Sequence, residues 1–292
     1  MTLVQCIVDA DNYLGETPIW NAAEQALWWV NCEQPPALHR WDSRSGRHDE
    51  WPMPSRVGGF VPKEDGGVVV VLADGLYDWD PVSCALTLRV ASGLPDHVKL
   101  HECHCDRQGR LWLGAFDHHY PADRGAAGGW FQRLDHDRLI RVVAGISVAN
   151  GLAFSPDGRT MYATGRIRGQ VDAYDLDAGS GALSNPRCFI RHEGPGFIDG
   201  ATVDAQGAYW AAIVGMGELR RYTPAGALER VVALPFSNPT KPAFGGPDMA
   251  TLFVTSTKMT IPDTAAFGNN GGLFAMEPGE FGIAETPLSL MG

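Results

Sequence analysis

Short apolar segments alternate with turns along the whole chain, and one unit recurs about every 45 residues. Each copy has a short apolar strand, a turn rich in Asp, Gly and Pro, and a second strand with an aromatic or branched residue at its centre. The separations between these centres are 41, 43, 50, 48 and 43 residues. The centres are Trp28, Val69, Trp112, Tyr162, Trp210 and Phe253. Several strands at a period of roughly 40–50 residues are typical of β-propeller blades.

A third strand follows each copy, and a fourth follows most copies. Apolar and polar residues alternate within these segments with a period of two, and no stretch keeps a helical period. For the last copy, the segment at residues 285–290 is the expected fourth strand. The pattern therefore predicts an all-β protein: one domain over residues 1–292, folded as a six-bladed β-propeller with four antiparallel strands per blade. Two β-sandwiches are the alternative, but six repeats do not divide naturally between them.

Composition narrows the class of protein further. Hydrophobic residues make up 45% of the chain, which is enough for a packed core and excludes disorder. The net charge is −11 without a basic cluster, so nucleic acid and anionic membranes are not expected partners. No apolar run approaches a membrane span, and the N-terminus lacks a signal-peptide pattern. Six scattered cysteines make no disulfide framework, so we expect a cytoplasmic protein with free thiols.

Polar residues stand at matching positions in four repeats, near the start of the first strand. Glu16, Asn150 and Asp199 lie 11 or 12 residues before their second-strand centres, and His101 and Glu102 lie 11 and 10 residues before theirs. First strands of propeller blades line a common axis, so these side chains are expected to converge. Because buried carboxylates need a counter-charge, we expect one divalent metal ion there. Oxygen ligands suit Ca²⁺, Mg²⁺ or Mn²⁺, and a nearby imidazole would extend the choice to Zn²⁺ or Fe²⁺.

Two simpler interpretations of these residues stay open. Asn150 and Asp199 each precede a glycine, and either one alone is more typical of a turn. The run from His101 to Cys105 looks like a zinc motif, but alternate residues of a strand face opposite sides. No second Cys/His pair stands at structural-zinc spacing. A role for His101 as a substrate or metal contact is therefore favoured over a separate zinc site.

Five segments resemble the senescence-marker-protein/gluconolactonase/regucalcin family of six-bladed propeller lactonases. They are LGETPIW at 14–20, CDRQGRLWLGAF at 105–116, ANGLAFSPDGRTMYAT at 149–164, IDGATVDAQGAYWAA at 198–212 and TKPAFGGPDMATLFVTS at 240–256. The last two are most similar to bacterial sugar-acid lactonases of the xylonolactonase and arabinonolactonase kind. The resemblance implies a metal held by Glu16, Asn150 and Asp199. It also implies hydrolysis of an aldonolactone to the open-chain acid, with Asp199 as general base.

The chain departs from the family pattern on the substrate side. The family commonly has Arg-x-Asn-Asp where this chain has Lys99, Leu100, His101 and Glu102, and a glycine where it has Thr17. We therefore expect Lys99, His101, Glu102 and also His119 to bind substrate. Because Lys99 and His101 can carry positive charge, the lactone could bear a sulfonate or carboxylate group.

Two further functions remain alternatives. A related propeller with a similar calcium site hydrolyses phosphotriesters, so another metal-dependent esterase is one of them. The other is a non-enzymatic calcium-binding propeller. Trp-Asp pairs typical of scaffold propellers occur in only two blades, at Trp41-Asp42 and Trp79-Asp80. A scaffold also has no need for carboxylates in matching positions, so we expect a lactonase that binds a small sugar lactone as a monomer or small homo-oligomer.

Overall fold

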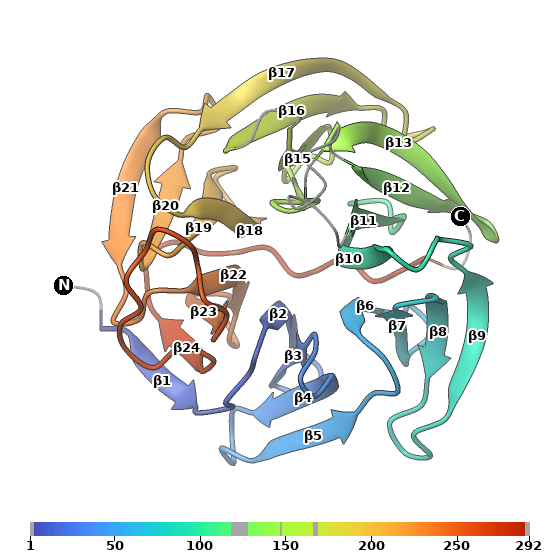
Figure 1. Cartoon of the computed structure of the whole chain (residues 1–292), viewed down its shortest axis with the longest axis horizontal. Helices are drawn as coiled ribbons and strands as arrows, with labels where there is room; N and C mark the ends of the chain where they lie inside the picture. Colours follow the sequence, from blue (N-terminus) through green and yellow to red (C-terminus); the bar gives the residue numbers. More distant parts are fainter. Residues whose placement is uncertain (1–2, 118–127, 147, 166–168, 290–292) are drawn as a thin grey trace. The chain divides into compact units, whose positions relative to one another are not determined.

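The structure is a computed structural model that describes residues 3–117, 128–146, 148–165 and 169–289. Within these residues there are 24 strands and no helix, and the strands form six four-stranded antiparallel sheets. Figure 1 labels these strands except β14. Each sheet corresponds to one sequence repeat, and we number the blades 1 to 6 in chain order. The all-β class and the six-bladed β-propeller predicted from the repeats are thereby confirmed.

The chain divides into two compact units of three blades each, which we describe separately. The first unit comprises Met1–Pro54 and Phe189–Glu285. Its strands, in hydrogen-bonded order, are β2 (Gly15–Asn21), β3 (Ala26–Asn31), β4 (Ala37–Asp42) and β5 (His48–Pro52) in blade 1; β18 (Phe197–Val203), β19 (Tyr209–Val214), β20 (Glu218–Tyr222) and β21 (Leu228–Ala233) in blade 5; and β22 (Pro239–Gly245), β23 (Thr251–Ser256), β24 (Leu273–Met276) and β1 (Gln5–Val8) in blade 6.

The second unit comprises Ser55–Cys188 and Thr286–Gly292. Its strands are β6 (Val57–Pro62), β7 (Val68–Leu72), β8 (Gly75–Trp79) and β9 (Leu86–Ala91) in blade 2; β10 (Val98–Cys105), β11 (Leu111–Asp117), β12 (Gly129–Asp135) and β13 (Arg138–Ile146) in blade 3; and β14 (Ala153–Phe154), β15 (Thr160–Thr164), β16 (Gln170–Leu176) and β17 (Leu183–Arg191) in blade 4. All six second-strand centres lie in the second strands, as predicted. That the whole chain is a single domain stays a prediction.

The outer strand of blade 6 differs from the prediction. It is the N-terminal strand β1, which pairs with β24 in a register that includes Gln5 opposite Ala275. In the predicted segment 285–290, the described residues 285–289 do not supply it, and residue 290 lies outside the described residues. Pro287 in that segment has no N–H to donate to a ladder, and Leu288 instead makes a parallel bridge with Lys63 in the second unit.

One hairpin motif explains why first and second strands form where they do. In blade 3, the Asp106 carboxylate accepts hydrogen bonds from the Gln108 and Arg110 backbone and, at 2.9 Å, from the Trp112 indole. In blade 5, the Asp204 carboxylate accepts the Trp210 indole N–H at 3.0 Å in the same way. An Asp six residues before a Trp therefore fixes both the tight turn and the rotamer of the core tryptophan, because one carboxylate satisfies both.

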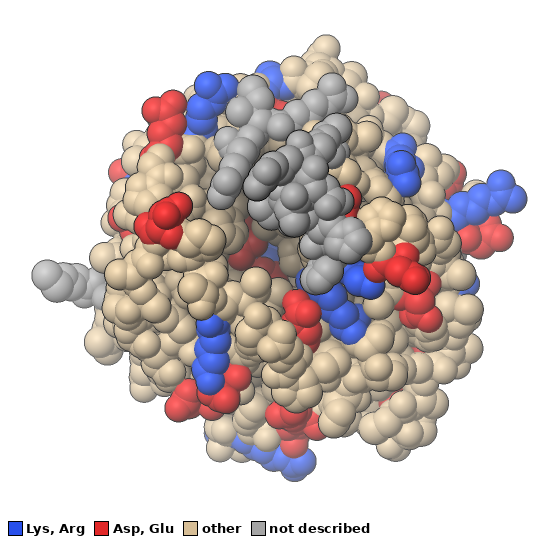
Figure 2. Space-filling view, viewed as in Figure 1, with Lys and Arg blue, Asp and Glu red and all other residues tan. Residues whose placement is uncertain are grey.

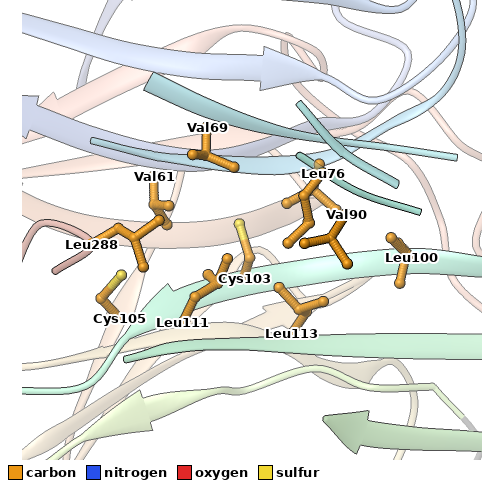
Figure 3. Packing of buried hydrophobic residues seen from close by; sticks show 11 residues of the cluster. Val61, Val69, Leu76, Val90, Leu100, Cys103, Cys105, Leu111, Leu113 and Leu288 are labelled. Atoms are coloured by element: carbon orange, nitrogen blue, oxygen red, sulfur yellow. The ribbon is translucent and has the colours of Figure 1, made fainter. Parts of the chain in front are cut away.

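Apolar side chains between neighbouring blades form the core. Figure 3 shows one such cluster in the second unit. Its buried members are Val61, Val69, Val71, Leu76, Val90, Leu100, Cys103, Cys105, Leu111, Leu113 and Leu288. They come from blades 2 and 3 and from the C-terminal segment. Burial of large aliphatic side chains contributes roughly 1.5–3 kcal/mol each, so these contacts hold the first strands of the two blades rigidly against each other.

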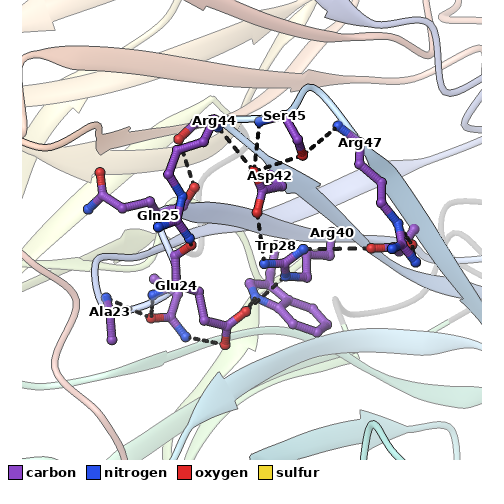
Figure 4. Close-up of polar contacts among 12 residues, drawn as sticks. Ala23, Glu24, Gln25, Trp28, Arg40, Asp42, Arg44, Ser45 and Arg47 are labelled. Atoms are coloured by element: carbon purple, nitrogen blue, oxygen red, sulfur yellow. Dashed lines mark hydrogen bonds and ion pairs between the residues drawn. The ribbon is translucent and has the colours of Figure 1, made fainter.

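Polar side chains fasten β3 to β4 in blade 1. Figure 4 shows Arg40 donating to the Glu24 carboxylate at 2.8 Å, beside Trp28, which is its cross-strand partner. The Trp28 indole donates to the same carboxylate at 3.3 Å. The Glu24, Trp28 and Arg40 side chains are all at least partly buried. Their hydrogen bonds therefore fix the orientation of these side chains more than an ion pair in full contact with water would.

Candidate active site

The first strand of each blade breaks its ladder at a matching position along the strand. In β2, β6, β10, β18 and β22 the register with the second strand shifts there. In blade 4 the chain is irregular immediately before β14, with Gly151 at a φ of 66°. The residues at these breaks are Thr17, Gly58, Glu102, Asn150, Asp199, Gly200, Thr240 and Lys241. Because bulges re-aim side chains and are common beside active sites, we take these matching breaks in each unit as the candidate functional positions.

In the first unit, Glu16 lies at the bulge of β2 and is only 2% exposed. Its carboxylate accepts the backbone N–H of Thr17 at 3.0 Å. Thr17 has a φ of 50°, in the left-handed region that a β-branched residue rarely adopts. The Thr17 hydroxyl is buried and has no hydrogen-bond partner within the described part of the chain. The bulge thus holds the Glu16 carboxylate at a cost in backbone strain, which is typical of functional positions.

Asp199 lies at the bulge of β18 and is 6% exposed. Its neighbour Gly200 meets the Lys241 side chain of β22: a Cβ at Gly200 would come within 2.6 Å of Lys241 Cβ and Cγ. Lys241 is itself buried. On the other side of β22, the Thr240 hydroxyl donates to the Gly15 carbonyl at 2.5 Å. Strand β22 therefore packs the stem of the buried Lys241 against β18 and bonds Thr240 to β2, the two strands that carry the carboxylates.

In the second unit, three residues of three blades form a hydrogen-bonded chain. The Asn150 amide oxygen is 2.9 Å from His101 Nε2, and His101 Nδ1 is 3.3 Å from an Arg56 guanidinium nitrogen. Arg56 also donates to the Leu100 carbonyl at 2.8 Å. Both His101 and Asn150 are buried. The structure thus joins the predicted residues His101 and Asn150 directly.

The remaining predicted substrate residues have separate surroundings. The Glu102 carboxylate accepts the Leu152 backbone N–H at 3.1 Å, and Glu102 has a φ of 42°. Lys99 lies on β10, opposite Phe116 of β11, and is partly exposed. His119 lies outside the described residues. Substrate contacts by Lys99, His101, Glu102 and His119 therefore stay predictions.

The predicted metal ligands divide between the two units: Glu16 and Asp199 belong to the first, Asn150 to the second. Their donor atoms, two carboxylates and an amide oxygen, suit a hard divalent ion. Both carboxylates are almost fully buried, and burying such charges without compensation is costly. Among the described residues, no group of three or more His, Cys, Asp and Glu side chains could bind a metal. The trio is not such a group, because its third member is an amide, and its assignment stays a prediction.

Sequence reasoning missed three residues at or beside these breaks. Arg56 precedes β6 without a motif, and only its contact with His101 reveals it. Lys241 lies inside the segment TKPAFGG, which was noted for its resemblance but not for its charge. Thr17 was noted only as a departure from glycine, whereas its positive φ marks it as strained. The period-two alternation of apolar and polar residues did not point to any of these three residues, because bulges interrupt that alternation.

Surface features add little to the site. On the face shown in Figure 2, acidic and basic side chains are interspersed among the described residues, without an extended basic patch. In the same part of the chain, we find no helix with the length and hydrophobicity to cross a membrane. The absence of nucleic-acid partners stays a prediction.

Comparisons with known proteins agree with this arrangement of blades. Residues 14–258 match the model of the SMP-30/gluconolactonase/LRE-like region. A 6-deoxy-6-sulfogluconolactonase of Pseudomonas putida is 34% identical over 97% of both chains, and a pentonolactonase of Haloferax volcanii is 30% identical over 96% of both. A solved luciferin-regenerating enzyme has a TM-score of 0.91 at 26% identity and covers 99% of this chain and 100% of its own. The calcium-binding protein regucalcin of Agrobacterium tumefaciens has a TM-score of 0.89 at 26% identity, covering 99% and 98%. The chain therefore belongs to the SMP-30/gluconolactonase/LRE-like family, as its motifs predicted.

Proposed function

We propose that this chain, a lactonase of that family, hydrolyses a sugar lactone to the open-chain acid with the help of one divalent metal ion. One observation carries the proposal: Glu16 and Asp199, two nearly fully buried carboxylates, stand at matching bulges in the first strands of their blades. Asn150 stands at the corresponding break in blade 4. The named lactonase relatives support sugar lactones as the substrate class.

Glu16, Asn150 and Asp199 would hold the metal. When bound, a divalent ion supplies Lewis-acid polarisation of the lactone carbonyl. Ca²⁺, Mg²⁺, Mn²⁺, Zn²⁺ and Fe²⁺ are the candidates, and the likeness to regucalcin, a calcium-binding protein, favours Ca²⁺ among them. The Thr17 N–H stabilises the ionised form of Glu16, which is the form a cation needs.

Asp199 is the proposed general base. A carboxylate can take the proton of an attacking water as the water adds to the carbonyl carbon, and can return it to the ring oxygen as the ester bond breaks. Its burial in β18 keeps bulk water away, which strengthens electrostatic interactions at the reacting atoms. The Lys241 stem packs over the adjacent Gly200, so the β18 bulge has little freedom to shift.

The substrate we propose carries an anionic group. Lys99 and Lys241 place two cations at or beside the first-strand breaks, where recognition of hydroxyl groups alone would need none. A relative at 34% identity is named for a sulfonated gluconolactone. A charge-assisted hydrogen bond to such a group contributes roughly 1.5–3 kcal/mol. A monomer or small homo-oligomer in the cytoplasm is the proposed setting. None of the six cysteines, all of which lie in the described residues, forms a disulfide, which is typical of a reducing compartment.

A panel of neutral and acidic sugar lactones tests the proposal, with hydrolysis followed by a pH indicator. The chain is first treated with a chelator, and each candidate metal is then restored separately. We expect hydrolysis to return with a metal in the wild type and in Glu193→Gln, an exposed control, but not in Glu16→Gln. Hydrolysis that persists unchanged after chelation would contradict metal dependence. Metal binding without hydrolysis of any lactone would favour the calcium-binding alternative, and turnover of phosphotriesters alone would favour the esterase alternative.

A further inference from the structure

Arg56, His101 and Asn150 link the starts of three consecutive blades in the second unit. Gly58 makes the link possible, because a Cβ at that position would lie 2.6 Å from the Leu100 carbonyl oxygen. Only glycine therefore lets β6 approach β10 closely enough for Arg56 to bond the Leu100 carbonyl and reach His101 Nδ1.

The guanidinium group decides which tautomer His101 adopts. Arginine has donors but no acceptor, so a bond to His101 Nδ1 requires a lone pair on that nitrogen. The proton of the neutral ring must then sit on Nε2. Nε2–H is in turn a donor, so the Asn150 atom facing it at 2.9 Å must be the carboxamide oxygen, as the structure has it. The three side chains are mutually consistent in only this arrangement.

Neighbouring groups hold the chain of hydrogen bonds in place. The Phe116 ring lies under the Arg56 guanidinium, with 5.2 Å from Cζ to its centroid, and meets the His101 ring edge-on at 5.5 Å. On the far side, the Asn150 backbone N–H donates to the Thr164 hydroxyl at 3.0 Å, and that hydroxyl donates to the Val148 carbonyl at 2.9 Å. Asn150 is thus held both at its backbone N–H and at its side-chain amide oxygen.

We infer that Arg56 is a positioning residue that acts through His101: it fixes the Nε2–H tautomer, and this tautomer aims and holds the Asn150 carboxamide oxygen. The inference rests on the proposed function in one respect, since it assumes that this oxygen binds the metal. The oxygen keeps its second lone pair for that purpose. Removing outer partners of metal ligands typically weakens metal affinity about 10–100-fold.

The first test is spectroscopic and needs neither metal nor substrate. Nitrogen-15 chemical shifts of the His101 ring, measured where the imidazole is neutral, report the tautomer directly. We expect the Nε2–H form in the wild type and a mixture of tautomers in Arg56→Met. Arg56→Gln, whose amide can still donate to Nδ1, should keep the Nε2–H form. An Nδ1–H tautomer in the wild type would overturn the inference even if Arg56→Met failed to fold.

The second test measures metal affinity by chelator competition, with Ca²⁺ and Mn²⁺ as probes. We expect Arg56→Met to bind metal about 10–100-fold more weakly, Arg56→Gln to recover most of the loss, and Arg89→Met, which removes an exposed partner of Asp78 in blade 2, to match the wild type. Unchanged affinity in Arg56→Met together with a raised KM for acidic lactones would make Arg56 a substrate contact instead. A wild-type chain that binds no metal would overturn the proposed function, while the tautomer measurement would still decide the role of Arg56.

Discussion

The backbone N–H of Thr17 donates to the carboxylate of its own neighbour Glu16 at 3.0 Å while Thr17 stays at a φ of 50°. Both features belong to the β2 bulge: the peptide plane between the two residues points the Thr17 N–H at the carboxylate, and the positive φ of Thr17 sets the path of the chain after it. The chain gives up stability here to hold a buried carboxylate in one orientation. The same trade is common where a backbone positions a reacting or binding group.

Replacement of Thr17 by glycine should therefore stabilise the fold. Glycine removes the strain of a β-branched residue at positive φ and the buried hydroxyl without a partner, and these gains outweigh its larger loss of chain entropy. We expect the free energy of unfolding in urea to rise by about 1 kcal/mol. Thr17→Ser keeps the hydroxyl and should gain clearly less. A destabilised Thr17→Gly would show that the threonine makes a compensating contact.

Asp199→Asn should lose hydrolysis by more than it loses metal. Asparagine keeps an oxygen that can bind a cation but cannot accept the proton of the attacking water. We expect kcat to fall about 10²–10⁴-fold, with metal affinity measured in parallel by chelator competition. The exposed Asp137→Asn variant serves as the matched control. Turnover within a few-fold of the wild type, with metal bound, would assign the general base to another residue.

Lys99→Met and Lys241→Met test the preference for an acidic lactone. If either ammonium group binds the substrate anion, its loss should lower kcat/KM for the acidic lactone about 10–100-fold. The value for the neutral analogue should change little. Lys258→Met, a lysine paired with Asp11 at the surface, is the control. An equal fall for both substrates would indicate that the lysine supports the site rather than selects the anion.

His39 should make the fold sensitive to mild acid. Burial, followed by the nearby His48, lowers the pKa of His39 from 6.5 to about 3. Between these two values the unfolded chain binds more protons than the folded chain, so the free energy of unfolding falls as the pH drops below about 6.5. The loss amounts to about 1 kcal/mol per pH unit.

The His39→Phe variant isolates this contribution, because phenylalanine can keep the stacking on Trp29 but cannot titrate. Urea unfolding at several pH values should give a shallower slope for the variant between pH 6.5 and 4. Identical slopes for both proteins would show that His39 is not the group responsible.

The propeller could be predicted from the sequence because its signals are local. A hairpin needs a turn residue, a period of two and a core aromatic at fixed spacing, and Asp106 with Trp112 shows all three within seven positions. The matching positions of Glu16, Asn150 and Asp199 could also be found from the sequence, because each residue lies 11 or 12 residues before the centre of its own second strand. The outer strand of blade 6 was predicted wrongly because β1 pairs with β24 from the opposite end of the chain.

The sequence by itself determined the class of fold and the family, and it predicted matching positions for Glu16, Asn150 and Asp199. The tertiary structure alone decided which side chains act on one another there. Arg56 and His101 are 45 residues apart and meet only because Gly58 lets β6 approach β10. The Lys241 stem packs against β18 only because Gly200 has no Cβ to block it. The physical reason is that bulges and close strand contacts depend on the packing of neighbouring blades, which no pattern within a single repeat records.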